Sequence, residues 1–334
     1  MKKSELANQG IPMWVNAKKD LPGAEGASFD SFFVSCEFEG EDGNRYGVVW
    51  HQQTVMGQFM TAQILLADPA NARDINIPFT GMNGMGCSIS NEKLECISPL
   101  GTLSGDEKEM HLTFEVEGAS GDLILRPTEM VLYNGGTGLL YFLSSMDNHQ
   151  FSFPTMEVEG TFTLDGKTHQ IKNTTAWFDR QWGFNNTSNQ ITEGEGLNRL
   201  SWAWIGFPLG KNREEAISLW DSFALDGRYA FATKYNADGT QVNHVCDITY
   251  KDVWKSEVSG SSYPGGVHVE IPTAEISLDL DILPGDPEFY HPENGLCGFE
   301  ALCKINGTYK GEAIDRYGFL EIIGDVCGEV SIVS

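Results

Sequence analysis

The sequence predicts a protein built almost entirely of antiparallel β-strands, and three observations carry that prediction. Short β-branched and aromatic runs alternate with turns, and Asp-Gly pairs at 42–43, 165–166, 226–227 and 238–239 separate such runs. Asp-Gly tolerates the positive φ angles of tight hairpins. Convincing helical periodicity is scarce, and 37 glycines are available for corners and bulges. We therefore expect closed or strongly curved β-barrels rather than flat sheets with open edges.

The expected elements follow one another as hairpins along the chain. One hairpin spans residues 32–54, a second spans 156–179, and a three-stranded meander spans 221–252. Only 65–74 and 210–216 are short helix candidates, and both contain or adjoin breakers. A polar stretch at 183–198 is the expected domain boundary. This division gives an N-terminal β-barrel over 1–190 and a C-terminal β-barrel over 191–334.

Composition narrows the class of partner. The chain has 47 acidic and 22 basic side chains, a formal net charge of -25. The electrostatic field of this negative charge repels phosphate backbones and anionic lipid headgroups. We therefore expect no binding of nucleic acid and no insertion into membranes. No acidic cluster resembles a calcium loop, and the seven scattered cysteines predict neither a zinc site nor a disulfide framework. No signal peptide or bilayer-spanning apolar run is recognisable, so we expect a cytoplasmic protein.

An unusual strand, TTAWFDRQWG at 174–183, gathers large and charged side chains. An unpaired buried charge is very costly, so an arginine on an interior face there needs a carboxylate or a ligand. The alternative is an exterior cation–π stack against the other domain. Alternation along the strand places Phe178, Arg180 and Trp182 on one face and Trp177, Asp179 and Gln181 on the other.

Two further strands carry candidate residues. Trp202 and Trp204 share a face of the stretch 200–207. In 216–223, Asp221 lies on one face between Leu219 and Phe223. Desolvation in such an apolar wall would raise the pKa of an acid and keep it protonated as a proton donor. The alternative is an acid at a strand end or barrel mouth, in contact with water.

An ordered set of motifs points to a family. The segments are 28–50, 141–183 with its A-W-x-D-[HR]-x-W-G pattern, the W-x-W strand at 200–209, 253–272 and 298–324. Together they resemble the carotenoid hydratase (hydroxyneurosporene synthase) family and its AttH-like lipocalin-fold relatives, over most of residues 28–325. Those relatives include phytoalexin hydratases and fungal pericyclases.

The resemblance implies two lipocalin-like β-barrels packed together, with a hydrophobic cavity associated with their interface and no metal or organic cofactor. The family's motif His and the Trp two residues later correspond here to Arg180 and Trp182, and the acid of a following strand corresponds to Asp221, with Asp179 as a rival. A guanidinium cannot shuttle a proton at neutral pH, but it can polarise a carbonyl or enolate oxygen. The arginine therefore moves the expected substrate towards an oxygenated molecule.

The favoured hypothesis is a cofactor-independent enzyme acting on an apolar, unsaturated terpenoid, polyketide or enone, by hydration or dehydration or by cyclisation or isomerisation. A carrier of a lipophilic ligand is the alternative. A hydrolase is a third possibility, with His51 as its base, although no G-x-S-x-G elbow is present. In the enzyme, Asp221, Arg180 and Asp179 would carry the chemistry and a set of aromatic residues would line the pocket: Trp182, Phe178, Trp177, Trp204 and Trp202.

Overall fold

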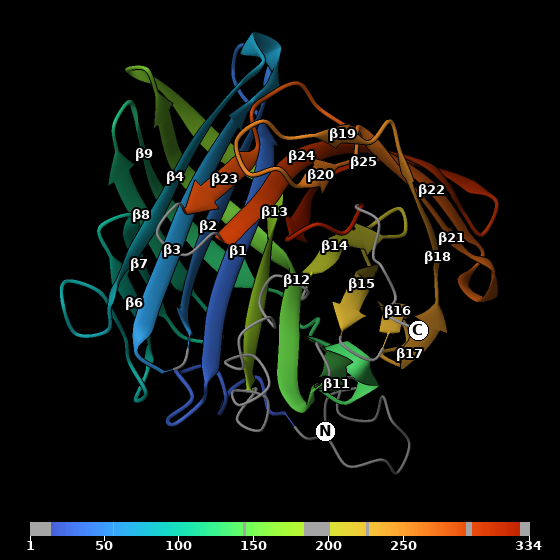
Figure 1. Cartoon of the computed structure of the whole chain (residues 1–334), viewed down its shortest axis with the longest axis horizontal. Helices are drawn as coiled ribbons and strands as arrows, with labels where there is room; N and C mark the ends of the chain where they lie inside the picture. The colour runs from blue at the N-terminus through green and yellow to red at the C-terminus, as the bar shows by residue number, and fades with distance from the viewer. Residues whose placement is uncertain are drawn as a thin grey trace.

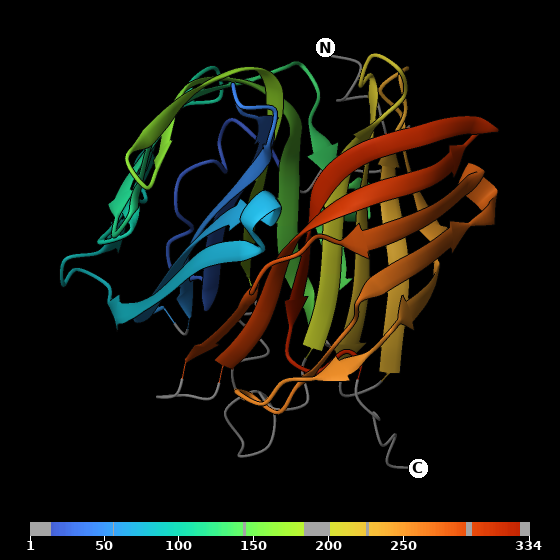
Figure 2. The ribbon, with the colours of Figure 1, turned by 90° about the horizontal axis from the view of Figure 1, so that it is seen from above.

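The computed structural model describes residues 15–55, 57–142, 145–183, 201–224, 227–291 and 296–327. Within these ranges the chain forms two large, strongly curled antiparallel sheets that lie side by side (Figure 1 and Figure 2). No α-helix occurs in the described ranges, so the predicted all-β class is confirmed. The domain boundary expected at 190/191 lies outside the described residues.

The N-terminal sheet is a curled, open antiparallel sheet in which the first strand, β1, pairs with β13. β10 (Leu132–Tyr133) and β11 (Leu139–Phe142) pair with β12 beside the main path. The path runs β4 (Arg73–Met82), β3 (Phe59–Asp68), β2 (Arg45–Val55), β1 (Phe29–Glu39), β13 (Lys167–Gly183), β12 (Ser145–Leu164), β9 (Ala119–Pro127), β8 (Met110–Val116), β7 (Gly101–Gly105), β6 (Leu94–Ser98), β5 (Ser88–Ile89).

The C-terminal sheet has a similar order, with its first strand, β14, paired to its last, β25. β23 (Glu288–His291) pairs with β24, and β19 (Trp254–Lys255) with β20 (Ser262–Tyr263). The path runs β17 (Gln241–Val245), β16 (Gly227–Tyr235), β15 (Glu215–Ala224), β14 (Ser201–Leu209), β25 (Glu312–Ile323), β24 (Leu296–Tyr309), β22 (Ile276–Ile282), β21 (Gly266–Ile271), β18 (Asp247–Lys251).

Turn chemistry explains where strands end. The predicted hairpin over 156–179 is confirmed as β12 and β13, with Asp165 and Gly166 at φ 49° and 79°. The short helix candidate at 65–74 does not form a helix: β3 continues to Asp68 and a single 3₁₀ turn, Pro69–Asn71, leads into β4. Ala72 is left-handed at φ 50°, which ends that turn and reverses the chain. The helix expected at 210–216 is also absent, and β15 begins at Glu215.

Three apolar clusters define the packing. One fills the interior of the N-terminal sheet, one fills the interior of the C-terminal sheet, and the third lies between the two sheets. Ring pairs in the third cluster add about 0.5–1.5 kcal/mol each beyond their buried area. Its members come from the outer faces of both sheets and include Phe33, Val49, Leu65, Trp177, Trp204, Trp220, Leu302 and Phe319.

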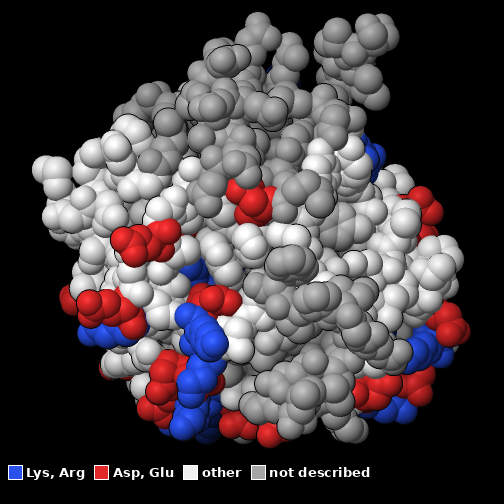
Figure 3. Space-filling model, turned by 90° about the horizontal axis from the view of Figure 1, so that it is seen from below, with Lys and Arg blue, Asp and Glu red and all other residues white. Residues whose placement is uncertain are grey.

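The surface carries mixed charge. On the face seen from below, acidic and basic side chains lie next to each other around the rim (Figure 3). All seven cysteines are free. No helix in the described part of the chain is long and apolar enough to cross a membrane.

Candidate active site between the two sheets

Strand β13 divides the predicted site residues between two environments, as its alternation predicts. Phe178 belongs to the core of the N-terminal sheet, and Trp182 packs against that core. Trp177 belongs instead to the cluster between the sheets. Asp179, on the Trp177 face, accepts a hydrogen bond from the Trp177 indole, with 2.8 Å between Nε1 and Oδ1. The two faces of one strand therefore serve a barrel interior and the domain interface.

Arg180 is fully buried on the barrel side, and its donors are engaged by the protein. Nη1 lies 2.5 Å from Oδ1 of Asp30 on β1, and Nη2 donates to the Pro22 carbonyl at 2.8 Å. The guanidinium also lies over the rings of Phe32 and Trp182, at 4.3 and 4.8 Å. The carboxylate that an interior arginine requires is thus Asp30. The expected substrate-polarising position of Arg180 is not what the structure shows.

Asp221 lies on the other side of the C-terminal sheet from Asp179, on the β15 face that carries Leu219 into the barrel core. It is fully buried and forms a two-pronged ion pair with Arg228, at 2.8 Å to Nε and 2.7 Å to Nη2. The Tyr250 hydroxyl donates to it at 2.7 Å. The expected apolar wall is therefore wrong, because the cation comes from the neighbouring strand β16, which alternation along β15 cannot reveal.

The interface brings together two rows of side chains, one from each sheet. Each row consists of residues directly opposite one another on successive strands. The rows meet where Phe33 contacts Trp204 edge to face, with 5.4 Å between ring centroids. The N-terminal row is His51, Phe33, Asp179 and Ser152. The C-terminal row is Glu300, Glu321, Trp204 and Trp220.

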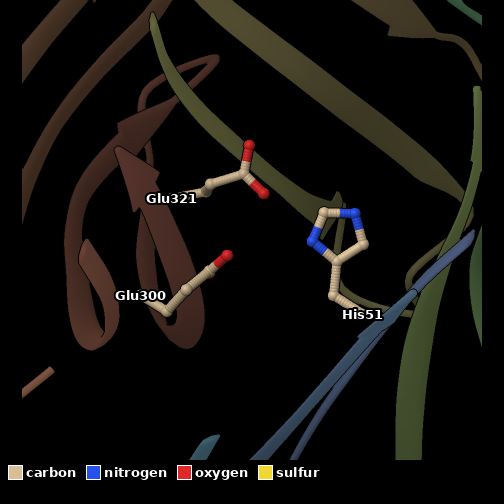
Figure 4. Close-up of side chains that lie close together, drawn as sticks. All are labelled: His51, Glu300 and Glu321. Carbon is tan, nitrogen blue, oxygen red and sulfur yellow. The ribbon is translucent and has the colours of Figure 1, made fainter. Parts of the chain in front are cut away.

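His51 faces the two glutamates across this interface (Figure 4). One ligand-type atom from each of His51, Glu300 and Glu321 lies within 4.8 Å of the others. The ring is held by the Ser31 hydroxyl at 2.8 Å from Nε2 and by an edge contact with Phe33. Burial lowers the pKa of His51 to about 4, so the imidazole is neutral at neutral pH.

Glu300 and Glu321 form a buried carboxyl pair. Burial raises the pKa of both, and the neighbouring Glu321 raises that of Glu300 further. Glu321 accepts a hydrogen bond from the Trp202 indole, with 2.6 Å between Nε1 and Oε1. Apart from its contact with Glu321, neither oxygen of Glu300 has a hydrogen-bond partner among the described residues. Two adjacent buried carboxyls cannot both ionise, so the pair retains a proton, held on Glu300.

Asp179 is a third acid beside this pair. Burial raises its pKa to about 7, hydrogen bonds from Ser152 and Trp177 lower it, and the charge of Glu321 raises it. Asp179 therefore changes charge close to neutral pH, next to the carboxyl pair.

The surrounding wall is aromatic but retains unused polar atoms. Phe142 contacts Trp202 and Trp220, with ring centroids 5.4 and 4.8 Å apart. Buried polar atoms without partners among the described residues include Trp220 Nε1, Ser222 Oγ and Gln150 Oε1. These atoms suit a mostly apolar ligand that carries an oxygen function.

The same three groups offer the nitrogen and oxygen atoms that Zn²⁺ or Fe²⁺ uses. Ligands of one such ion stand about 3–4 Å apart, because each lies about 2.0–2.2 Å from the metal. The ligand atoms of His51, Glu300 and Glu321 lie within 4.8 Å of one another. A metal ion needs ionised carboxylate ligands, whereas burial raises the pKa of both glutamates, so we interpret the three groups as an acid–base cluster.

Four residues predicted from the sequence lie at this interface: Asp179, Trp177, Trp202 and Trp204. His51, weighed as a base, lies there too, whereas Glu300 and Glu321 were not predicted. Each glutamate is a single acid inside an apolar strand, within FEALC and FLEII. A lone acid in an apolar strand is also the pattern that singled out Asp221. The same pattern therefore indicates Glu300 and Glu321 as candidates.

Two curled antiparallel sheets that lie side by side, each around its own apolar interior, define a lipocalin-like double barrel. The AttH-like family model matches residues 29–325, so the chain belongs to the AttH-like family.

Relatives agree with this assignment. The dehydratase asqC of Emericella nidulans is 28% identical over 224 residues, which cover 60% of this chain and 57% of that protein. The fold matches kievitone hydratase from Nectria haematococca, with a TM-score of 0.78, 18% identity and 95% of each chain covered. It also matches an AttH candidate from Nitrosomonas europaea, with a TM-score of 0.77, 17% identity, and 96% of this chain and 99% of that one covered.

Proposed function

We propose that this protein is a lyase that removes water from, or adds water to, an apolar unsaturated small molecule bound between the two sheets. The observation that carries the proposal is the buried Glu300–Glu321 pair, which retains a proton and leaves the oxygens of Glu300 without other partners. Support comes from the names of two relatives, a dehydratase and a hydratase.

The pair can supply both proton transfers of a dehydration. Glu300, protonated, donates its proton to the leaving hydroxyl, which departs as water. Glu321, whose ionised form is favoured by the Trp202 hydrogen bond, accepts the proton from the adjacent carbon as the double bond forms. The proton then returns from Glu321 to Glu300 and restores the starting state. Hydration is the reverse sequence.

Other residues hold this pair and the substrate. His51 and Ser31 form the opposite wall, and a neutral imidazole leaves the proton on the carboxyl pair. Asp179 sets the charge beside Glu321. Trp177, Trp202 and Trp204 bound the substrate, and their faces favour an apolar body with an oxygen function, of the terpenoid, polyketide or enone type. Arg180 and Asp221 receive no chemical role, because each is engaged in an ion pair away from the interface.

The test is mass spectrometry in ¹⁸O-labelled water with a panel of apolar enones, polyenes and hydroxylated terpenoids. We expect a product heavier or lighter by one water with the wild type. Glu300→Gln keeps the shape but removes the donated proton, so it should turn over about 10²–10⁴-fold more slowly. Glu312→Gln is the matched control, because it changes an exposed carboxyl that pairs with Lys211.

Two results would contradict the proposal. A product of unchanged mass and new retention time would indicate a cyclase or isomerase. Compounds retained unchanged and equally by wild type and Glu300→Gln would indicate a carrier, which has no use for a buried proton-bearing pair.

A further inference from the structure

A recess lies between the two sheets, beside Trp177. It is a groove of about 360 Å³ between the sheets, lined from β1, β13, β14, β24 and β25. Trp177 lines this groove, while its indole N–H donates to Asp179. The chemistry proposed above does not use the groove.

The groove is basic in an otherwise acidic protein. Its lining includes four cationic side chains, Arg45, Arg213, Lys304 and Arg316, against the two carboxylates Glu37 and Asp315. The lining therefore carries a net formal charge of two positive, within a chain of -25. A local field of opposite sign to the whole molecule concentrates anions at that place.

Two of the four cations are neutralised within the protein. Arg45 Nη1 lies 2.6 Å from a carboxylate oxygen of Glu37, and Lys304 is paired with Asp315. Both also flank the ring of Tyr317, at 4.4 Å for the Arg45 guanidinium and 4.2 Å for the Lys304 amine. The charges of Arg45 and Lys304 are thus balanced by carboxylates of the groove wall.

Arg213 and Arg316 are not neutralised in this way. No carboxylate of the described residues lies within 4.0 Å of either guanidinium. Arg213 donates to the Thr175 hydroxyl at 2.6 Å, and Arg316 donates to the Gly210 carbonyl, so each is oriented by a neutral acceptor. Burial lowers the pKa of Arg316 and the charge of Arg213 lowers it further, while the more distant carboxylates of Glu214, Glu37 and Asp315 partly offset this. The two guanidiniums therefore repel each other, and an anion between them would relieve that repulsion.

The remaining lining mixes the polar side chains of Ser35, Thr175 and Tyr317 with an apolar part. Trp177, Phe207, Pro208 and Phe319 present rings and hydrocarbon to the groove. We propose that the groove binds a small organic anion, with its carboxylate or other anionic oxygen group between Arg213 and Arg316 and its apolar body against Trp177 and Phe319. Guanidinium forks bind such groups through paired charge-assisted hydrogen bonds.

The test is isothermal titration of the full-length protein with benzoate, and separately with inorganic phosphate. We expect benzoate to bind, and Arg213→Gln and Arg316→Gln each to weaken it about tenfold or more, because each removes a charge-assisted pair. Arg126→Gln is the matched control, since that arginine is paired with Glu109 and Glu159 on the N-terminal sheet. Melting temperatures of the variants verify that they are folded.

The outcomes separate clearly. Equal benzoate affinity in all four proteins, or no binding at about 10 mM ligand, would overturn the proposal. Phosphate binding as tightly as benzoate would overturn the assigned role of the apolar wall. Because binding is measured without turnover, the result does not depend on the lyase proposal.

Discussion

Glu300 and Glu321 lie directly opposite each other on β24 and β25, and both point into the interface towards His51 (Figure 4). Directly opposed like charges destabilise a strand pair, and burial increases that cost. The arrangement is tolerable because the pair retains a proton. A pair kept at that cost in the core of an interface is expected where proton transfer is needed.

Asp179→Asn should remove the alkaline limit of activity. Above about pH 7, Asp179 ionises, and its negative charge beside the carboxyl pair makes Glu300 a weaker proton donor. Wild-type kcat should therefore fall as pH rises through about 7. The variant should keep its activity to higher pH, as measured in kcat profiles between pH 5 and 9. Identical profiles would show that Asp179 does not govern the pair.

Stability should fall as pH rises from about 4 to about 7. Asp179 and Asp74 both have pKa values raised to about 7, mainly by burial, so the folded state binds more protons than the unfolded state in that interval. The sign is the reverse of that for ion-paired carboxylates, whose stabilisation is lost in acid. Urea unfolding at pH 5.5 and 7.5 measures the difference, and Asp179→Asn should reduce it. An unchanged difference in the variant would exclude Asp179 as a source.

Asp30→Asn should destabilise the fold by about 3–5 kcal/mol, because it leaves the Arg180 guanidinium buried without its carboxylate. Replacing both residues, in Asp30→Asn with Arg180→Met, should recover most of that loss. Urea unfolding of the two single variants and the double variant measures the coupling. If Arg180→Met were instead stable but inactive, the arginine would act on the substrate after all.

Gly206→Ala should disturb the tryptophan wall. A Cβ there would lie 2.6 Å from Cζ2 of Trp177 and 2.7 Å from Cζ2 of Trp204, so the rings must shift. We expect a loss of about 1–3 kcal/mol in unfolding free energy. Gly318→Ala is the control, because its nearest contact is the end of the flexible Ile305 side chain at 3.1 Å. Equal losses in both variants would mean that the ring contacts are not tight.

Dialysis against EDTA should leave turnover unchanged, because the raised pKa values of Glu300 and Glu321 disfavour the ionised carboxylates that a metal ion needs. The measurement is the rate before dialysis, after it, and after adding back Zn²⁺ or Fe²⁺. If EDTA removed the activity and an added metal restored it, the cluster would be a metal centre rather than an acid–base cluster.

The sequence was informative about single strands. Alternation along β13 correctly separated Arg180 from Asp179, and turn residues located the hairpins. The sequence did not predict contacts that depend on a neighbouring strand. Asp30 and Arg228, which neutralise Arg180 and Asp221, come from β1 and β16. The opposition of Glu300 and Glu321 is likewise a property of the register between β24 and β25.

The wall that carries His51 belongs to one sheet, and the wall that carries Glu300 and Glu321 belongs to the other. Neither half of the chain contains a complete site by itself. During synthesis, β2 is made early and β24 and β25 near the end, so the candidate site is assembled only when the two finished sheets pack together. If the proposed function holds, we expect a half-unfolded molecule to be inactive, and two separately expressed halves to be active only when they are mixed.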